Sequence, residues 1–167
     1  YIAGSLKKNG FEPHILDCIT GIKPEIIELD EELEYLKKIY TVDFSPARLF
    51  HNYYRFGYSA AQLEEIIKTE KYDCYCISSN FTAYYKTALE TASIIRRIHP
   101  TATVIGGDYN ARIMYDSFLK SGNFDYIIFF EGENTIIKLL KNLDKTAPVN
   151  NIAFLRDDRI IKTAGKS

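Results

Sequence analysis

The sequence predicts a doubly wound parallel α/β sheet, because strand and helix patterns alternate three times in its second half. The predicted strands are short apolar runs, and the run at residues 126–130 lacks the polar alternation of a half-exposed strand. Each run precedes a stretch with apolar residues at helical spacing. Repeated strand–helix–strand units form parallel sheets with right-handed crossovers and helices on both faces. We therefore expect a three-layer domain of the flavodoxin-like or Rossmann-like type.

Three strand–helix pairs and a terminal hairpin make up this regular half. We predict strands at residues 73–78, 103–105 and 126–130, followed by helices over residues 88–98, 113–119 and 136–143. His99 and Pro100 end the first of these helices. Two further apolar runs, residues 152–155 and 159–161, flank two aspartates and predict a hairpin.

The first part of the chain is less regular. Residues 1–8 predict a helix that ends at an Asn-Gly pair. Residues 11–17 predict a strand with Asp17 at its carboxyl end. A strand normally precedes the first helix of such a sheet, so we expect the first strand to lie upstream of Tyr1.

Residues 22–71 interrupt the alternation, and their content predicts a helical insertion. An acidic stretch follows Pro24 and lysines come later, an order that complements a helix dipole, and we interpret these charges as a solvated face. A Ser-x-x-Gln capping box at Ser59 predicts a second helix to about Lys68. Residues 50–58 are dense in aromatic side chains, which either cover an edge of the core or dock a neighbouring domain.

We assign residues 1–150 to one domain that contains the insertion, and residues 151–167 to a hairpin and linker toward a further domain. The 167 residues, 46% of them hydrophobic, suffice for a core without disulfides. A formal net charge of -1 gives no reason to expect nucleic acid or an anionic membrane as partner. Three cysteines suit a reducing compartment, and we expect a cytoplasmic protein. No apolar run reaches the roughly 20 residues of a membrane span, and no signal-peptide pattern opens the chain.

Ligands of open α/β sheets bind outside the carboxyl ends of the strands, near the point where the strand order reverses. Three predicted loops leave strands at that edge, and their glycine, hydroxyl and amide groups suit the close approach of a ligand. Ordinary strand-to-helix turns prefer the same residue types, so this pattern leaves both interpretations open. The candidate cofactor-binding residues are Ser78, Ser79, Asn80, Phe81 and Thr82 in the first loop, Gly106, Gly107, Asp108 and Tyr109 in the second, and Glu131, Gly132 and Glu133 in the third.

Other familiar sites lack their motifs. Residues 164–167 resemble the end of a phosphate-binding P-loop, but Ile160 stands where its first glycine is required and no helix follows. No Gly-x-Gly-x-x-Gly follows a strand, so a nicotinamide dinucleotide site has no support. Cys74 and Cys76 have no second pair and no nearby histidine, so we predict no metal site. The three histidines are scattered without a nucleophile placed for a triad, and we predict no catalytic residue.

Three strand ends carry a recognisable series of residues. Residues 72–79 begin with Tyr-Asp, continue as a largely apolar run and end in two serines. Residues 104–107 end in Gly-Gly, and residues 125–133 end in Glu-Gly-Glu. In this order they resemble the cobalamin-binding domain that precedes the catalytic domain of radical S-adenosylmethionine enzymes. The opening helix with residues 11–17, and the terminal hairpin, are similar to that family's first segments and to its link to the catalytic domain. The resemblance covers most of the chain outside residues 22–71.

Several positions depart from the family's pattern. Cys76 stands where glycine is usual, and Phe130 takes the place of the first glycine in a Gly-Glu-Gly-Glu turn. Asp108 and Tyr109 replace a common Pro-His pair. The Asp-x-His-x-x-Gly motif of methionine-synthase-type relatives is not reproduced around His14. The resemblance therefore implies binding that leaves the lower face of cobalt without a protein histidine.

The resemblance implies that the corrin ring of cobalamin lies over the carboxyl edge of the sheet, contacted by the three loops. It also implies a downstream radical S-adenosylmethionine domain of the same chain, which would hold an iron–sulfur cluster and S-adenosylmethionine in a methyltransferase or a related carbon-skeleton enzyme. The Cys-x-x-x-Cys-x-x-Cys run that holds such a cluster does not occur in the 167 residues. We therefore expect no catalysis by this chain alone and make no enzyme assignment for it. Its expected partners are cobalamin and the downstream domain.

Two other hypotheses stay open. In the first, the domain keeps the fold but has lost the cofactor, with Tyr109 and Phe130 filling the corrin site, and acts as a structural or domain-docking module through residues 50–58. In the second, it is a receiver-like signalling domain of the same fold, which needs clustered acids and a lysine at strand ends. Asp17, Asp108 and Glu131 are not spaced for such a cluster, and no such lysine is evident.

Overall fold

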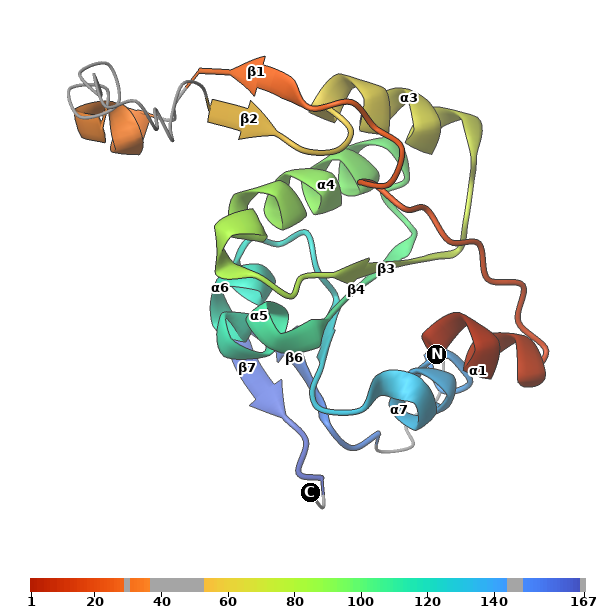
Figure 1. Ribbon diagram of the computed structural model, residues 1–167. Helices are drawn as coiled ribbons and strands as arrows, with labels where there is room; N and C mark the ends of the chain where they lie inside the picture. Colours follow the sequence, from red (N-terminus) through yellow and green to blue (C-terminus); the bar gives the residue numbers. More distant parts are fainter. Residues whose placement is uncertain (29–30, 37–52, 144–148, 166–167) are drawn as a thin grey trace. The chain divides into compact units, whose positions relative to one another are not determined.

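The computed structural model describes residues 1–28, 31–36, 53–143 and 149–165 of the chain (Figure 1). Two compact units are present, residues 1–15 with 60–167 and residues 16–59. The larger unit contains a five-stranded sheet in the order β3-β4-β5-β6-β7. Its strands are β3 (Cys74–Ser78), β4 (Thr103–Gly107), β5 (Tyr126–Ile128), β6 (Ile152–Arg156) and β7 (Arg159–Lys162).

Strands β3, β4 and β5 are parallel, which confirms the predicted α/β class. β6 and β7 form the predicted terminal hairpin, and β6 pairs antiparallel with β5. Asp157 and Asp158, at the tip of the hairpin, have φ values of 49° and 58°. A two-residue turn with positive φ at both positions matches the twist of the strands that it joins.

Helices cover both faces of the sheet, as the three-layer class requires (Figure 1). Adjacent residues of a strand point to opposite faces, and Val104 and Ile105 of β4 are only 0% and 2% exposed. On the Ile105 face, α1 (Ile2–Lys8) packs against α7 (Gly132–Leu140), and both helices contribute to one apolar cluster. Phe11 packs against the same cluster.

The other face carries the helices that connect the parallel strands. α4 (Tyr85–Ile98) follows β3 after a short 3₁₀ turn, η2 (Thr82–Tyr84). α5 (Asp108–Ile113) and α6 (Tyr115–Lys120) follow β4, and they replace the single predicted helix over residues 113–119. Tyr85 of α4 and Phe118 of α6 lie ring to ring with centroids 5.5 Å apart. The outer helix α3 (Ala60–Thr69) packs against α4 and confirms the predicted helix after Ser59.

The prediction of a strand at residues 11–17 is wrong. These residues belong to neither described sheet. Pro13 has no backbone N–H to donate to a neighbouring strand. Asp17 Oδ1 accepts hydrogen bonds from the backbone N–H groups of Ile19 and Thr20, both at 2.9 Å. The aspartate therefore closes a local turn instead of ending a strand at the edge of the sheet.

The prediction that an acid-rich helix follows Pro24 is wrong at its start, and residues 37–38, where its lysines lie, are outside the described ranges. β1 (Glu25–Ile27) pairs antiparallel with β2 (Tyr53–Arg55), and η1 (Glu31–Leu36) forms a 3₁₀ helix between them. Glu25 and Arg55 face each other in this pair and form an ion pair. Because opposite charges directly across two strands stabilise the pairing, the glutamate contributes to a two-stranded sheet and not to the first turn of a helix.

The aromatic segment at residues 50–58 is only partly described. Residues 37–52 lie outside the described ranges, so the first part of this segment does too. Tyr53 and Phe56 expose 42% and 54% of their surface. Aromatic side chains at this exposure do not cover a core within their unit. They therefore stay available to dock a neighbouring domain, as the second interpretation requires.

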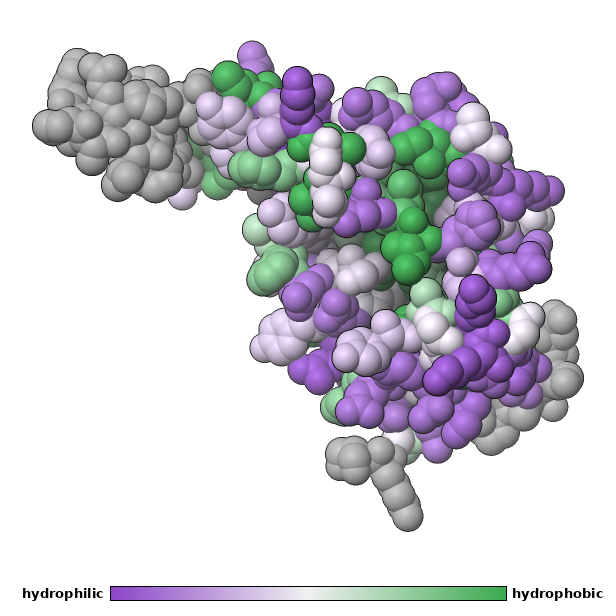
Figure 2. All heavy atoms as spheres, turned by 45° about the vertical axis from the view of Figure 1, so that its right-hand side comes forward, coloured by the Kyte–Doolittle hydropathy of each residue, from purple (hydrophilic) through white to green (hydrophobic). Residues whose placement is uncertain are grey.

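The described sheet has an open edge at β3. In the described part of the chain β3 pairs with β4 alone, so one row of its backbone groups has no neighbouring strand. Natural sheets normally cover or blunt such an edge. The order of the parallel strands, β3-β4-β5, also contains no reversal, so the described sheet lacks the switch point at which ligands of this fold class bind. Figure 2 shows a band of hydrophobic side chains between hydrophilic ones on one face of the molecule.

Gly106 and Gly107, at the end of β4, have opposite surroundings. A Cβ atom on Gly106 would lie 2.6 Å from Cδ1 of Ile127, whereas a Cβ on Gly107 would meet nothing within 4 Å. We expect Gly106→Ala to lower the free energy of unfolding by about 1–3 kcal/mol through overpacking. Gly107→Ala should change it by less than about 0.5 kcal/mol. Urea denaturation of the two variants measures the difference, and equal losses would contradict this account of β4.

Candidate functional site

Hydrogen bonds join the first two candidate loops into one surface at the carboxyl edge of the sheet. Ser79 is 3% exposed, and its backbone N–H donates to the Gly107 carbonyl at 3.0 Å. The Ser79 carbonyl accepts the backbone N–H of Asn110 at 2.9 Å, and Ser79 Oγ accepts the Asn110 Nδ2 group at 2.9 Å. Ser78 Oγ donates to Asp108 Oδ2, also at 2.9 Å. We call these five residues the carboxyl ledge.

Asn110 carries a buried acceptor without a partner. The residue is 1% exposed, and its Oδ1 atom has no hydrogen bond within the described ranges. Nearly all buried polar atoms in proteins are paired, so an unpaired carbonyl oxygen at this edge suits a donor that a ligand brings. Asn110 was not among the candidate residues, although it directly follows Tyr109 in the second loop.

Two residues at the ends of β4 and β5 have left-handed backbone conformations. Asp108 has a φ of 80°, and its Oδ1 accepts the backbone N–H of Tyr109 at 2.9 Å. Aspartate tolerates this region better than most residues because its short side chain bonds locally. Phe130 has a φ of 59°, at the position where the family's turn has glycine. A bulky residue there costs about 1–2 kcal/mol, and strain of this kind is concentrated at functional sites.

Exposed aromatic rings lie beside the carboxyl ledge. Phe81, Tyr109 and Phe130 are 63%, 56% and 61% exposed. The guanidinium carbon of Arg112 lies 5.2 Å from the Tyr109 ring centroid and 5.5 Å from that of Phe130. We call Tyr109, Arg112 and Phe130 the Tyr109–Arg112–Phe130 cluster. It links α5 to the loop after β5, and Tyr109 and Phe130 present their rings to solvent.

Arg112 was not among the residues selected from the sequence. The predicted helix began at residue 113, whereas α5 begins at Asp108 and places Tyr109 and Arg112 three residues apart on one helix. Residues at this spacing are neighbours on a helix surface. The signal was present in the sequence, but it depended on the start of a helix that was placed too late.

The third candidate loop is partly engaged in packing. A Cβ on Gly132 would lie 2.9 Å from Cδ1 of Ile2, so the missing side chain allows α1 to approach α7. The Glu133 carbonyl accepts the hydroxyl of Ser5 at 3.4 Å. Glu131 is exposed at the start of α7.

Of the first-loop candidates, Asn80 and Thr82 are exposed, and Phe81 meets the Tyr84 ring edge to face.

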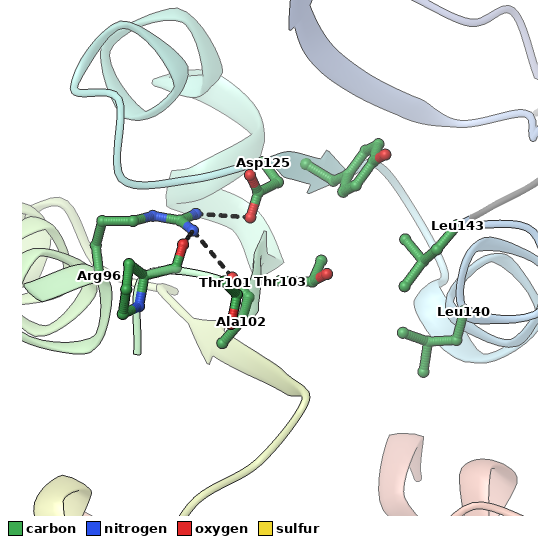
Figure 3. A pocket seen from close by; sticks show the side chains of 9 residues that line it. Arg96, Thr101, Ala102, Thr103, Asp125, Leu140 and Leu143 are labelled. Carbon is green, nitrogen blue, oxygen red and sulfur yellow. Dashed lines mark hydrogen bonds and ion pairs between the residues drawn. The ribbon is translucent and has the colours of Figure 1, made fainter. Parts of the chain in front are cut away.

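A hollow of about 450 Å³ lies at the opposite edge of the sheet, beside the amino ends of β4 and β5 (Figure 3). Arg96 donates to Asp125 Oδ2 at 2.7 Å and to the carbonyls of Pro100 and Ala102, both at 3.0 Å. The same Oδ2 atom accepts the backbone N–H of Val104 at 2.7 Å. These bonds fix the end of α4 to the starts of two strands, so the polar groups of this hollow have a structural role.

Cys74 and Cys76 lie on one face of β3 with their sulfur atoms 3.9 Å apart, and both are free thiols. The hydrogen bond between the two thiols and burial raise the pKa of Cys74, and the same bond lowers the pKa of Cys76. Within the residues that the structure describes, no three histidine, cysteine or carboxylate side chains are grouped to hold a metal ion. None of the helices in that part of the chain is long and apolar enough to span a membrane.

Comparisons with known proteins bear on the family and the fold of the chain. A family model described as the B12 binding domain matches residues 40–140. No curated protein matches the sequence. Two solved structures of the radical S-adenosylmethionine methyltransferase TsrM from Kitasatospora setae match with TM-scores of 0.64 and 0.63, both at 14% identity. The first contains a tryptophan substrate and an S-adenosylmethionine analogue, and the second contains cobalamin and a [4Fe-4S] cluster. The alignments cover 98% of this chain and 26% of the TsrM chain, and at this identity they show a shared fold.

Phe130→Gly and Phe130→Ala both remove the ring, but only glycine also removes the cost of a φ of 59°. We expect the glycine variant to be more stable than the alanine variant by about 1 kcal/mol. Tyr109 supplies the matched control, because it lies in α5. Tyr109→Gly should be less stable than Tyr109→Ala by about 0.5–1 kcal/mol. Urea denaturation of the four variants gives both differences, and the same sign for both pairs would contradict strain at Phe130.

Proposed function

Because the chain belongs to the family of B12-binding domains, we propose that it binds cobalamin over the carboxyl ends of β3 and β4, as the cofactor domain of a radical S-adenosylmethionine enzyme. The observation that carries the placement is the carboxyl ledge, which brings residues of two predicted loops together at one edge. Ser78, Ser79, Gly107 and Asp108 are the residues that we assign to this contact.

The residues at this edge fit the chemistry of cobalamin. The rim of a corrin ring carries amide side chains, whose N–H groups can donate to the unpaired Oδ1 of Asn110. The space above Gly107 lets a flat ring approach the backbone. The exposed rings of Phe81 and Tyr109 offer apolar surface beside it. When bound, cobalamin supplies a cobalt atom that can accept and transfer a methyl group. The residues of this chain hold and orient the cofactor.

The proposal extends to a longer protein. The chain spans 26% of the TsrM chain, whose remaining part lies outside the alignment. We infer that residues 1–150 are the cofactor domain and that residues 151–167 lead to a downstream domain of the same chain. That domain would hold the iron–sulfur cluster and S-adenosylmethionine, and methyl transfer is the reaction class that the likeness to TsrM favours. The free thiols of the three cysteines are in keeping with a cytoplasmic protein.

We further propose that the open edge of β3 pairs with a strand from upstream of Tyr1. Such a strand would lead directly into α1, which already packs on the sheet face that it would extend.

A protein extended upstream should test this strand. We expect the backbone amides of β3 to exchange with solvent deuterium at least about tenfold more slowly in the extended protein, because a second neighbouring strand protects an edge. The amides of β7, at the other edge of the sheet, are the internal control and should keep their exchange rates. Unchanged exchange in β3 would contradict the proposed pairing.

Cobalamin binding is tested by titrating hydroxocobalamin and methylcobalamin into the full-length protein, with visible absorption and calorimetry as readouts. We expect altered corrin bands on binding. Gly107→Ala should weaken binding about tenfold, because its methyl group occupies the space where the ring approaches the backbone. Gly4→Ala is the matched control, since a Cβ there also meets nothing within 4 Å, on α1.

The titration has two informative failures. No binding by the unaltered full-length protein would refute the cofactor role and favour the structural or domain-docking module. Tight binding that Gly107→Ala leaves unchanged would refute the placement of the ring above Gly107, while the cofactor role would stand.

A further inference from the structure

Cys74 and Cys76 are a pair of chemically soft side chains that the proposed function does not use. Residues two apart on a strand share a face, and the two sulfur atoms lie 3.9 Å apart. Both thiols are free. Cys76 is exposed, whereas Cys74 is half-buried against the apolar cluster to which α1 and α7 contribute. One thiol is therefore open to solvent, and packing holds the other in place.

Strand geometry keeps the two thiols from forming a disulfide. The Cα atoms of residues two apart on a parallel strand are separated by about 6.6 Å. Side chains stand roughly perpendicular to the sheet, so the Cβ atoms keep a similar separation, whereas the Cβ atoms of a disulfide are only about 3.8 Å apart. A direct bond would require the backbone of β3 to move, and β3 is paired with β4 over its whole length.

An ion can bridge the two sulfur atoms where a covalent bond cannot. Metal–thiolate bonds are about 2.3 Å long, so two sulfur ligands of one ion lie about 3.8 Å apart at a tetrahedral angle and about 4.6 Å apart in a linear arrangement. The observed separation of 3.9 Å falls within this range. The pair can therefore hold an ion with little movement of either side chain.

The number of available ligands decides which ion fits. In the described ranges of the chain, no third cysteine, histidine or carboxylate is grouped with these two to hold a metal. Structural zinc sites take four protein ligands, so the lack of a second pair argues against zinc here. Soft thiolate ligands also select Cu(I), and this ion is satisfied by two of them. The pair therefore fits Cu(I) better than zinc.

We propose that Cys74 and Cys76 form a two-coordinate site for a soft monovalent cation, Cu(I), on one face of β3. Binding exchanges two S–H bonds for two S–Cu bonds and releases two protons to solvent, with no change in the oxidation state of sulfur or copper. The hydrogen bond from the Cys74 thiol lowers the pKa of Cys76. This favours a thiolate at the exposed position, which the ion meets first.

Alkylation by iodoacetamide tests the site in the full-length protein, kept reduced and free of oxygen. Mass spectrometry follows the tryptic peptide 72–86, which contains both cysteines, as Cu(I) is added in increasing amounts. The free thiolate is the nucleophile, so we expect bound Cu(I) to slow the labelling of both cysteines at least about tenfold. Cys18, a free cysteine outside β3, is the internal control and should stay reactive until much more Cu(I) is added.

Single variants separate a two-sulfur site from binding by one thiol. In Cys76→Ser, Cys74 should lose its protection by Cu(I), and in Cys74→Ser, Cys76 should lose it. Cys18→Ser is the matched control and should leave the protection of the pair unchanged. Because Cys74 packs against the apolar cluster, Cys74→Ala replaces the serine variant if thermal unfolding shows that serine disrupts the fold.

Three results would overturn the proposal. In the first, Cu(I) protects neither cysteine of the pair. In the second, one of the two stays protected after the other is replaced, which means that the ion is not held by both sulfur atoms. In the third, Cys18 is protected as readily as the pair, which means that β3 binds no better than a single thiol. None of these results bears on the cofactor role, which the cobalamin titration tests separately.

Discussion

The buried hydrogen bond between Ser79 Oγ and Asn110 Nδ2 is the contact on which the carboxyl edge of the sheet depends. Both residues are almost fully buried, and the backbone of Ser79 is bonded to Gly107 and to Asn110 as well. Loops that leave neighbouring strands normally move independently on the surface. Here two loops share one buried polar contact, and leaving one partner unpaired would cost about 1–3 kcal/mol. Exposed groups such as Ser78 and Asp108 are therefore held on a fixed base.

The amino edge of the same sheet is fixed in a comparable way by different chemistry. Arg96 and Asp125 tie α4 to the starts of β4 and β5 through bonds that use most of the arginine's donors. β4 is thus anchored at both ends and buried on both faces. Each edge holds one buried polar atom without a partner among the described residues, Arg96 Nε at the amino edge and Asn110 Oδ1 at the carboxyl edge. The choice of the carboxyl edge as the ligand side therefore rests on the general rule for open α/β sheets.

The sequence predicted the parts of the fold that burial imposes. β4, β5 and α4 are covered by neighbours, so their apolar residues repeat at the spacing of a buried strand or helix. The prediction of a strand at residues 11–17 failed because an apolar run forms a strand only beside a partner strand. The periodicity of the run does not show whether such a partner is present. The helix predicted after Pro24 was wrong at its start because Glu25 pairs with Arg55, thirty residues away, across two antiparallel strands. Arg112 was missed because the predicted helix began at residue 113, and its second ring contact is with Phe130 on another loop.

Phe130 shows how a departure from a pattern acquires a physical meaning. The sequence indicated only that a large ring stands where relatives have glycine. The structure shows that the backbone keeps the conformation that glycine would adopt, with a φ of 59°, so the turn is retained at a cost of about 1–2 kcal/mol. A ring that is 61% exposed recovers little of this through burial, and its contact with Arg112 is a surface interaction. The cost is therefore not explained by stability of the domain alone, and a role for the ring in binding is the explanation that the geometry favours.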